Sequence, residues 1–560
     1  MIDLNNDHLK KEYENETDIK RKIFLGYLYE QKKCFGLDFD DLITLALYIL
    51  ENYEEQRKKW QKRMMYVMVD EFQDVSKLNY NMAHILSDYH KNLFIVGDPD
   101  QTIYSWRGAR VEYILEFDKS HMNTKTIILN KNYRSSPEIL NASNSLIRNN
   151  KKRIEKELIA MKNHSVQTIY NHAKTTNLEA DWITTQIKSL INLGANFSDI
   201  AILYRSHFVS RSIEENFVKA KIPYVLYSGI EFYNRKEIKD IISYLRMILY
   251  ADDLSFQRVI NEPKRNIGKK RISYLKEYSE LYKCSMYTAL MKNIESEMFT
   301  STKANLFIEM VERYSNIYKE MKVSEILAGI LNESGYEAML REAGEQERLD
   351  NLSELKQSIF EFENGAGEDT TLEEYIQSIA LFTNFDKENK NDAVKMMTIH
   401  TAKGLEFPYV FVCGLNEGIF PNKHADTIDK LEEERRMAYV AYTRAENALF
   451  LSDSEGINYD GSFRYPSRFI FNTDKEYLEY VVDLEEKLIV DASKYIKANE
   501  ERITNIDRGF KVGDRICHKV FGKGSIIGIK EDISSYVIKF DGIETERNLS
   551  FRIQLEKIPE

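Results

Sequence analysis

The chain has 560 residues, 43% of them hydrophobic and 30% charged, and its formal net charge is −11. These values exclude a disordered chain and a single compact domain, and they predict three or four packed units. The acidic balance argues against a protein that coats nucleic acid through bulk positive potential, but it is compatible with a basic channel inside an acidic body.

Targeting signals are not evident. No uninterrupted apolar run is long enough to span a bilayer, and the polar, acidic start lacks the basic-then-apolar order of a secretory signal, so we expect no membrane partner. The four cysteines (Cys34, Cys284, Cys413 and Cys517) lie far apart and predict neither a disulfide framework nor a metal site. This usage favours a reducing cytoplasm.

The first third of the chain alternates between helical and strand-like patterns. The first 35 residues predict one or two exposed helices, and 38–50 predicts an apolar helix. Apolar runs at 64–74 and 92–101 each end in a polar cluster, with a helical stretch between them. This order is typical of the βαβ units of a parallel sheet, and a third run at 126–136 continues it.

A second set of strand-like runs follows at 199–206 and 394–415. The residues between them, 240–390, have a mostly helical pattern, which predicts a second α/β domain interrupted by a helical insertion. Residues 476–507 are highly charged and indicate a linker. The remaining residues alternate apolar and polar side chains around glycines, as in a small β-barrel.

The segment DEFQD (70–74) offers two adjacent carboxylates at the end of an apolar run. In an open parallel sheet, the carboxyl ends of the strands face the ligand crevice. Phosphoryl transfer there needs a metal and a positioned water, so Asp70 is a candidate Mg²⁺ ligand and Glu71 a candidate for orienting the water. An acidic helix start, stabilised by the helix dipole, explains this segment alone equally well.

GDPDQTIYSWRGA (97–109) follows the second apolar run at the same predicted sheet edge. Its polar side chains, Asp98 or Gln101, are placed to sense a phosphate. Tyr104, Trp106 and Arg107 offer stacking and charge for a single strand of nucleic acid. A lone exposed tryptophan is more often a packing residue, so Trp106 carries little weight by itself.

Five segments in series then resemble signature motifs of UvrD/PcrA/Rep-like superfamily 1 DNA helicases. They are DEFQD, GDPDQTIYSWRGA, LNKNYRSS (129–136), TIHTAKGLEF (398–407) and EEERRMAYVAYTRA (432–445). The resemblance extends from about residue 36 to the C-terminus. It implies an ATP-driven motor, with ATP and Mg²⁺ as cofactors, that moves 3′ to 5′ on single-stranded DNA, separates duplex or junction DNA and serves DNA repair.

The resemblance also implies an α/β fold with two RecA-like parallel-sheet lobes, the first one incomplete. The expected parts are an incomplete first lobe with a remnant of its helical insertion at 1–136, a second lobe at 137–240 and 390–475, a helical accessory insertion at 241–389, a linker at 476–507, and an SH3- or Tudor-like β-barrel at 508–560.

Site roles follow from the same resemblance, residue by residue. Gln101 is expected to contact the γ-phosphate, Tyr133 to stack on the adenine, and Arg134 and Arg444 to act as arginine fingers from the facing lobe. Gly404 and Glu406 are expected beside the nucleotide sugar or phosphates. An arginine whose position depends on lobe closure stabilises transition-state charge only when the cleft shuts. For either arginine alone, a surface salt bridge is the commoner fate.

The DNA contacts are less specific. His400 and Thr401, in TIHTAKG, are expected at a strand end and are candidates for phosphate contacts. They are candidates in addition to the platform of Tyr104, Trp106 and Arg107. Arg205 and Arg235 are candidates for DNA or interlobe contacts, although solvated helix faces explain them nearly as well.

A motor of this kind needs a GxxxxGK(S/T) loop, whose backbone amides cradle phosphates. Only Gly268 and Gly522 are followed by lysine, and neither lysine is followed by serine or threonine. We therefore expect a truncated first lobe that lacks its opening strands and does not hydrolyse ATP alone. A split or truncated gene, an expression fragment, or a pseudo-motor kept for binding would each explain this, and the intact site residues favour the first two.

Two further functions stay open. The chain could be a non-catalytic adaptor that binds single-stranded DNA and docks on RNA polymerase through residues 508–560, as the Tudor-like barrel of the resembled helicases does. A nuclease-associated subunit is the other, but no added carboxylate-rich domain supports it.

Overall fold

The computed structural model describes residues 6–34, 36–227, 229–366, 370–383, 392–458, 461–507, 510–518, 521–530, 535–541, 546–550 and 555–558. The chain divides into two compact units. The first comprises Met1–Leu129 with Lys152–Glu155, and the second comprises Asn130–Lys151 with Lys156–Glu560. Among the described residues, no helix has the length and apolar character needed to cross a bilayer.

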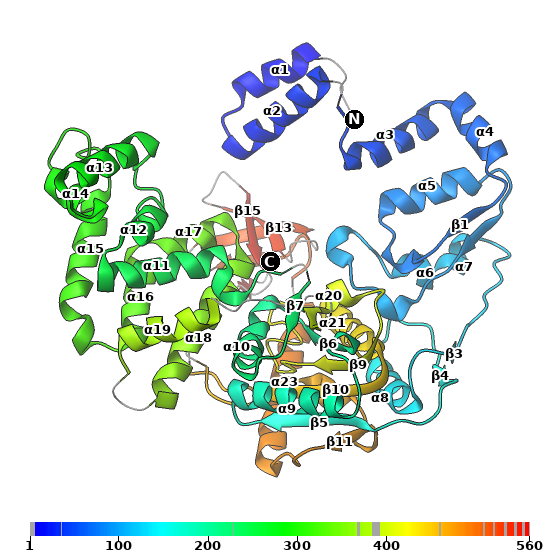
Figure 1. The fold of residues 1–560 in the computed structure, drawn as a ribbon. Helices are drawn as coiled ribbons and strands as arrows, with labels where there is room; N and C mark the ends of the chain where they lie inside the picture. The colour runs from blue at the N-terminus through cyan, green and yellow to red at the C-terminus, as the bar shows by residue number, and fades with distance from the viewer. Residues whose placement is uncertain are drawn as a thin grey trace. The chain divides into compact units, whose positions relative to one another are not determined.

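The first unit opens with four helices. They are α1 (Asn6–Asn15), α2 (Ile19–Lys33), α3 (Phe39–Asn52) and α4 (Glu54–Arg63) (Figure 1). Helix α3 begins with a capping box, in which Asp38 accepts the backbone N–H of Asp41 and Asp41 accepts that of Asp38. The helix predicted at 38–50 is therefore confirmed.

A two-stranded parallel sheet follows, and it confirms the predicted βαβ unit. Strands β1 (Val67–Val69) and β2 (Leu93–Ile95) pair in register, and α5 (Lys77–Ser87) connects them. The short helices α6 (Glu112–Leu115) and α7 (Phe117–Ser120) complete the unit. Its small core contains the buried side chains of Phe72, Val75 and Phe117, against which Val69, Leu93 and Ile95 pack from one face of the sheet.

The other face of this sheet is bare. It carries Tyr66, Met68, Phe94 and Val96, whose exposed fractions are 70%, 75%, 59% and 45%. Met68 and Phe94 are paired across the two strands, so their side chains lie on the same face. We call these four residues the bare face.

The third strand predicted at 126–136 forms only in part. Residues 125–130 adopt neither helix nor strand, and the side chains of Ile127, Ile128 and Leu129 are exposed. Only Lys131–Asn132 (β3) pairs, with Ile159–Ala160 (β4) of the second unit. The apolar run has no neighbouring strand among the described residues of the first unit, and a strand without a ladder partner leaves its amides unpaired.

The second unit contains a seven-stranded, all-parallel sheet in the order β11-β5-β10-β9-β6-β8-β7 (Figure 1). Its strands are β5 (Thr168–Ala173), β6 (Ile200–Tyr204), β7 (Tyr224–Leu226), β8 (Val394–Thr398), β9 (Phe407–Val412), β10 (Ala445–Ser454) and β11 (Leu478–Tyr480). The central strand β6 is buried along its whole length.

Helices cover this sheet on both faces. Helices α9 (Thr176–Asn192) and α10 (Ser210–Ala220) pack on one face, and α8 (Pro137–Ile147) and α21 (Ile428–Tyr442) on the other. The one-turn helix α20 (Ile399–Ala402) and α22 (Arg468–Asn472) lie in loops between strands. A parallel sheet with helices on both sides is the usual environment of continuous apolar strands.

The long region between β7 and β8 is helical. Its helices are α11 (Lys236–Tyr250), α12 (Asp253–Val259), α13 (Lys269–Tyr282), α14 (Met286–Asn293), α15 (Ala304–Ile317), α16 (Val323–Glu333), α17 (Tyr336–Ala343), α18 (Gln346–Ala366) and α19 (Leu372–Thr383). They share one apolar core. Buried Arg211 on α10 ties α18 to the sheet domain through Glu354 and Glu361, each at 2.6 Å.

The segment 476–507 differs from the linker that its charge predicted. Its first residues form β11, which pairs with β5, and α23 (Glu486–Asp507) is a helix that buries Leu488 and Ala492. Glu500 on this helix forms an ion pair with Arg468. The charged residues occupy the solvent side of an amphipathic helix, so composition alone gave the wrong impression.

The C-terminal residues form an antiparallel five-stranded sheet in the order β15-β14-β13-β12-β16. Its strands are β12 (Arg515–His518), β13 (Gly522–Lys530), β14 (Ser535–Phe540), β15 (Arg547–Ser550) and β16 (Leu555–Lys557). Ile516, Ile526 and Ile538 are in its core. With the parallel-sheet lobes, this small β-structure confirms the predicted α/β fold class.

Candidate active site

In the first unit, the predicted phosphate-chemistry residues gather at the carboxyl ends of β1 and β2. Asp70 follows β1 directly and is exposed, and its Oδ1 accepts the backbone N–H of Glu71 at 2.8 Å. Glu71 has a left-handed backbone, with φ of 49°. A non-glycine residue in this region is uncommon and clusters at functional sites, so the turn holds Glu71 in an unusual but defined position.

Gln73 links the two strand ends, although no sequence pattern marks it as a site residue. Its side-chain amide donates to Glu71 Oε2, and its Oε1 accepts the backbone N–H of Asp98 at 2.9 Å. A Cβ on Gly97 would lie only 2.5 Å from Gln73 Oε1, so a larger residue there would have to displace this side-chain amide. Gln101 donates to Asp98 Oδ2 at 3.0 Å, which places Gln101 beside the same edge.

The residues at this edge fit a magnesium ion shared with nucleotide phosphates. Mg²⁺ prefers oxygen ligands, keeps several waters and is commonly bound by one or two carboxylates plus phosphate oxygens. Asp70 supplies one exposed carboxylate of that kind. Among the described residues, no group of three or more His, Cys, Asp and Glu side chains is arranged to hold a metal.

The aromatic platform of Tyr104, Trp106 and Arg107 is preassembled in the first unit. The Arg107 guanidinium lies 4.9 Å from the ring centre of Tyr104 and 4.5 Å from that of Trp106. The two rings meet edge to face at 6.2 Å, and the Trp106 side chain is exposed. Burial, then the charges of Asp74 and Glu71, raise the Tyr104 pKa, so the platform adjoins the carboxylates.

In the second unit, Arg134, Glu406 and Arg444 meet at the amino edge of the large sheet. Asn132 Oδ1 accepts the backbone N–H groups of Arg134 and Ser135, both at 2.9 Å. Ser135 Oγ donates to the backbone carbonyl of Ala445 at 2.6 Å. These bonds fix the Arg134 backbone next to the residue after Arg444. Asn132 is a second positioning residue that the sequence analysis did not single out.

The two arginines contact adjacent residues of one loop. Arg134 Nε lies 2.5 Å from Glu406 Oε2, and Arg444 donates to the Leu405 carbonyl at 3.0 Å. Arg444 also donates to the Val440 carbonyl and is buried, whereas Arg134 and Glu406 are accessible. Gly404, with φ of 84°, provides the turn into this loop. Tyr133 precedes Arg134, and its ring is exposed.

His400 and Thr401 lie at the opposite, carboxyl edge of the same sheet, on helix α20. Thr398 caps this helix by accepting the Thr401 backbone N–H at 3.4 Å, and the two threonine hydroxyls are 3.0 Å apart. The segment 399–406 runs back from the end of β8 to the start of β9, since both strands are parallel to β6. It therefore connects the candidate DNA residues with the candidate nucleotide residues.

Two arginines considered for DNA or interlobe contacts are engaged elsewhere. Arg205 forms a two-pronged ion pair with Glu434, with N–O distances of 2.7–3.1 Å. Arg235 is buried and donates to the carbonyls of Ile230 and His207 and to the Asn351 side chain. This burial makes Arg235 a structural residue, contrary to that prediction.

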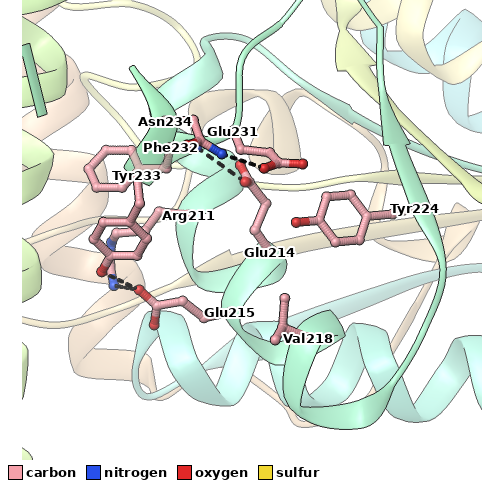
Figure 2. A pocket seen from close by; sticks show the side chains of 9 residues that line it. All are labelled: Arg211, Glu214, Glu215, Val218, Tyr224, Glu231, Phe232, Tyr233 and Asn234. Atoms are coloured by element: carbon pink, nitrogen blue, oxygen red, sulfur yellow. Dashed lines mark hydrogen bonds and ion pairs between the residues drawn. The ribbon is translucent and has the colours of Figure 1, made fainter. Parts of the chain in front are cut away.

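A small acidic pocket lies between α10 and the turn that precedes α11 (Figure 2). The residues of this turn come directly before Arg235 in the sequence. Glu214 accepts hydrogen bonds from Ser210 Oγ and from the Phe232 backbone N–H. Burial raises the pKa of Glu214 to about 7. Nearby, Glu215 accepts the Tyr233 hydroxyl at 2.8 Å and pairs with Arg211. These bonds anchor the turn on α10.

Two family models match the chain. Residues 3–122 match the UvrD/REP helicase N-terminal domain, and residues 127–456 match the UvrD-like helicase C-terminal domain.

Several relatives are similar along most of the chain. The ATP-dependent DNA helicase PcrA of Staphylococcus epidermidis is 35% identical over 543 residues, covering 94% of this chain and 74% of that protein. PcrA of Staphylococcus aureus is 33% identical over 550 residues, with the same coverages. A probable DNA helicase II homolog of Mycoplasma capricolum is 36% identical over 510 residues, covering 89% of this chain and 70% of that protein. The chain therefore belongs to the UvrD-like family of ATP-dependent DNA helicases.

Proposed function

We propose that the chain is the DNA-tracking and transition-state-stabilising part of a 3′-to-5′ DNA translocase and helicase of the PcrA type, active in DNA repair. The observation that carries this proposal is the meeting of Arg134, Glu406 and Arg444 around one exposed loop. In the first unit, the strand ends carry Asp70, Glu71 and Gln101, the candidate residues for phosphate and Mg²⁺.

In this proposal the first-unit residues prepare the attacking water. Gln73 holds Glu71 in a left-handed turn. From there Glu71 orients the water or accepts a proton from it. Gln101 contacts the γ-phosphate, and Asp70 is the protein ligand of Mg²⁺. When bound, Mg²⁺ would neutralise negative charge on the phosphates.

The second-unit residues stabilise the charge that develops on the transferred phosphate. Arg134 is accessible and paired with Glu406, so nucleotide phosphates compete with this carboxylate for the guanidinium. Arg444 holds Leu405 through its carbonyl and keeps the loop in place. Tyr133 provides an exposed ring for stacking on the adenine. Charge stabilisation by an arginine finger raises the rate about 10³- to 10⁵-fold in this chemistry.

Single-stranded DNA is proposed to lie on the platform of Tyr104, Trp106 and Arg107, with His400 and Thr401 contacting phosphates. Base stacking on an aromatic ring tolerates any sequence, which suits a protein that moves along DNA. The Arg107 guanidinium, stacked on both rings, orients Trp106 and leaves its exposed ring available.

We also propose that these 560 residues do not hydrolyse ATP by themselves. They contain no GxxxxGK(S/T) segment, and neither the Asp70 carboxylate nor the two arginines can replace the amides and lysine of such a loop. The test is DNA-stimulated ATP hydrolysis by the purified chain. Turnover that disappears in Glu71→Gln would refute this part of the proposal.

The second candidate function is an adaptor without catalysis. The exposed apolar residues Val512, Ile527 and Ile529 of the C-terminal β-structure favour a docking role for residues 508–560, with RNA polymerase as the partner implied by family resemblance. A pull-down with purified RNA polymerase, comparing the chain with Ile527→Glu, separates this candidate from the motor. Polymerase binding without any effect on DNA translocation would favour the adaptor.

The cellular location is proposed to be the cytoplasm. All four cysteines are free thiols, and a reducing compartment keeps thiols in that state.

A further inference from the structure

Two histidines of the first unit come together away from the candidate active site. His84 lies on α5, and His121 directly follows α7. Nδ1 of His84 is 3.4 Å from Nε2 of His121. We propose that these two ring nitrogens bind a transition-metal ion of the Zn²⁺ class. The inference is independent of the proposed function, because neither histidine takes part in that chemistry.

The separation of the two nitrogens fits a shared metal ion better than it fits a hydrogen bond. Donor–acceptor distances of N–H hydrogen bonds are commonly about 2.7–3.2 Å, so 3.4 Å is long for a bond between two rings. In a tetrahedral site the Zn–N distance is about 2.0–2.1 Å, which places two nitrogen ligands about 3.3–3.4 Å apart. The ring centres are 5.4 Å apart, farther than the nitrogens, so the two nitrogens lie on the facing edges of the rings.

The surroundings of His121 determine which of its nitrogens carries the lone pair. Its Nδ1 lies 3.2 Å from the backbone carbonyl of Phe117. A carbonyl oxygen only accepts, so Nδ1 carries the proton, and in the neutral ring Nε2 is free to bind a metal. A carbonyl partner on the second ring nitrogen is the usual arrangement of histidine ligands. Burial lowers the pKa of His121 and so favours the neutral ring that a metal requires.

Packing also holds His121 in place before any ion binds. Its ring stacks on Phe117, with 4.2 Å between the ring centres, and Phe117 meets Phe72 edge to face at 5.6 Å. Thr124 Oγ1 donates to the backbone carbonyl of His121 at 2.6 Å. A ligand that is already fixed loses little conformational freedom on binding. His84 is exposed, so a hydrated ion reaches the pair directly from solvent.

The chemistry of two imidazoles selects the class of ion. Imidazole nitrogen suits Zn²⁺, Cu²⁺ and Ni²⁺, whereas Mg²⁺ prefers oxygen ligands such as the Asp70 carboxylate. The described part of the chain offers no third histidine, cysteine or carboxylate arranged with the pair, so water completes the coordination. The nearby charges are balanced, because Lys91 forms an ion pair with Asp88, one turn after His84.

A bound ion would join two separate parts of the first unit. It would link α5, which connects β1 and β2, to the residue after α7, whose Phe117 side chain is in the core with Phe72. An ion that binds only the folded state stabilises it. We therefore expect Zn²⁺ to raise the unfolding temperature of the chain.

The experiment titrates the purified 560-residue chain with ZnCl₂ in a calorimeter, after metal removal with EDTA and in the presence of excess Mg²⁺. We expect a Zn²⁺ site whose affinity falls at least about tenfold in His84→Ala and in His121→Ala. Zn²⁺ should raise the unfolding temperature of the wild type and not that of His84→Ala. His90→Ala is the matched control in the same unit. The His90 ring lies 3.1 Å from the Lys62 carbonyl, and this variant should bind Zn²⁺ like the wild type.

His84→Ala is the decisive variant, because His84 is exposed and His121 also packs on Phe117. Circular dichroism checks that each variant keeps its fold. Equal Zn²⁺ affinity in the wild type and in His84→Ala would overturn the inference, since the ion would then bind elsewhere, such as at a free cysteine. Failure of the wild type to bind Zn²⁺ at millimolar concentration would also overturn it. Neither result bears on the proposed motor, which ATP hydrolysis tests separately.

Discussion

The sheet of β1 and β2 and the seven-stranded sheet of the second unit are built from the same kind of sequence but differ in how far they are buried. In the second unit, β6 (IAILY) lies between helices and all five of its side chains are buried. In the first unit, the equally apolar run around β1 has one covered face and one bare face. The local sequence therefore specifies a buried strand in both cases, but among the described residues β1 is covered on one face only.

The preference of a sequence for strand structure is therefore distinct from the burial that neighbouring elements give to that strand. Strands β1 and β2 form where the apolar runs and turn residues predict them, although their sheet has only two strands among the described residues. The remaining apolar surface is not a defect of the strands, because it lies next to an assembled set of phosphate-chemistry residues.

The largest expected difference between the two sheets concerns core truncation. Leu203→Ala in β6 should lower the free energy of unfolding by about 2–5 kcal/mol, because it opens a cavity in a packed interior. Met68→Ala in β1 should change it by less than about 0.5 kcal/mol, as expected for an exposed side chain. Urea denaturation of both variants measures the contrast, and equal losses would show that the bare face is covered in solution.

The second difference is a pH dependence that a buried glutamate gives to the second unit. The folded-state pKa of Glu214 is about 7, above its ordinary value of 4.5. The stability that Glu214 contributes is therefore fully present below about pH 4.5 and is lost as the pH rises through 7, by at most about 3 kcal/mol. Glu214→Gln should flatten this decline in thermal unfolding curves recorded from pH 5 to 8. Glu295→Gln, at an exposed site, is the matched control, and a decline that persists unchanged in Glu214→Gln would assign it to another group.

The third prediction concerns the functional surface of the first unit. Trp106→Ala should weaken binding to an oligo-dT single strand by about 1–3 kcal/mol if a base stacks on the ring. Trp106→Phe should retain part of the affinity, because it keeps an aromatic face. Anisotropy titrations at one fixed salt concentration give both values. Unchanged affinity in Trp106→Ala would remove this residue from the platform.

The smallest effect is expected at the Arg134–Glu406 pair. Both side chains are accessible, so breaking the pair with Glu406→Gln should alter stability by less than about 1 kcal/mol. A double-mutant cycle with Arg134→Gln measures the coupling directly. A coupling of several kcal/mol would indicate a structural pair and not an arginine that is available to phosphate.

Much of the architecture and of the site was accessible from sequence because both are local. DEFQD and GDPDQ follow their strands directly, so the gathering of Asp70, Glu71 and Gln101 follows from parallel-strand geometry. The roles of Gln73 and Asn132 were missed, although both lie inside recognised motifs, since a side-chain amide bridging two loops leaves no periodic signal.

The remaining features depend on partners far apart in the chain. Arg235 is held by Asn351 and by carbonyls of a separate turn, and Arg211 is held by Glu354 and Glu361. No pattern around either arginine distinguishes such burial from a solvated helix face. Helix α23 was predicted as a linker for a related reason. It has few buried residues, and many of its other side chains are charged.

The segment 399–406 crosses the large sheet from its carboxyl edge to its amino edge. Its eight residues begin at the end of β8, include His400 and Thr401, and finish at Glu406, just before β9. The Thr398 side chain caps the start of the segment, and Arg444 donates a hydrogen bond to the Leu405 carbonyl near its end. Both ends of the segment are therefore held in place. The number of residues between Thr401 and Glu406 is therefore set by the distance between the two edges of the sheet. The spacing between these residues is consequently as constrained as their chemistry.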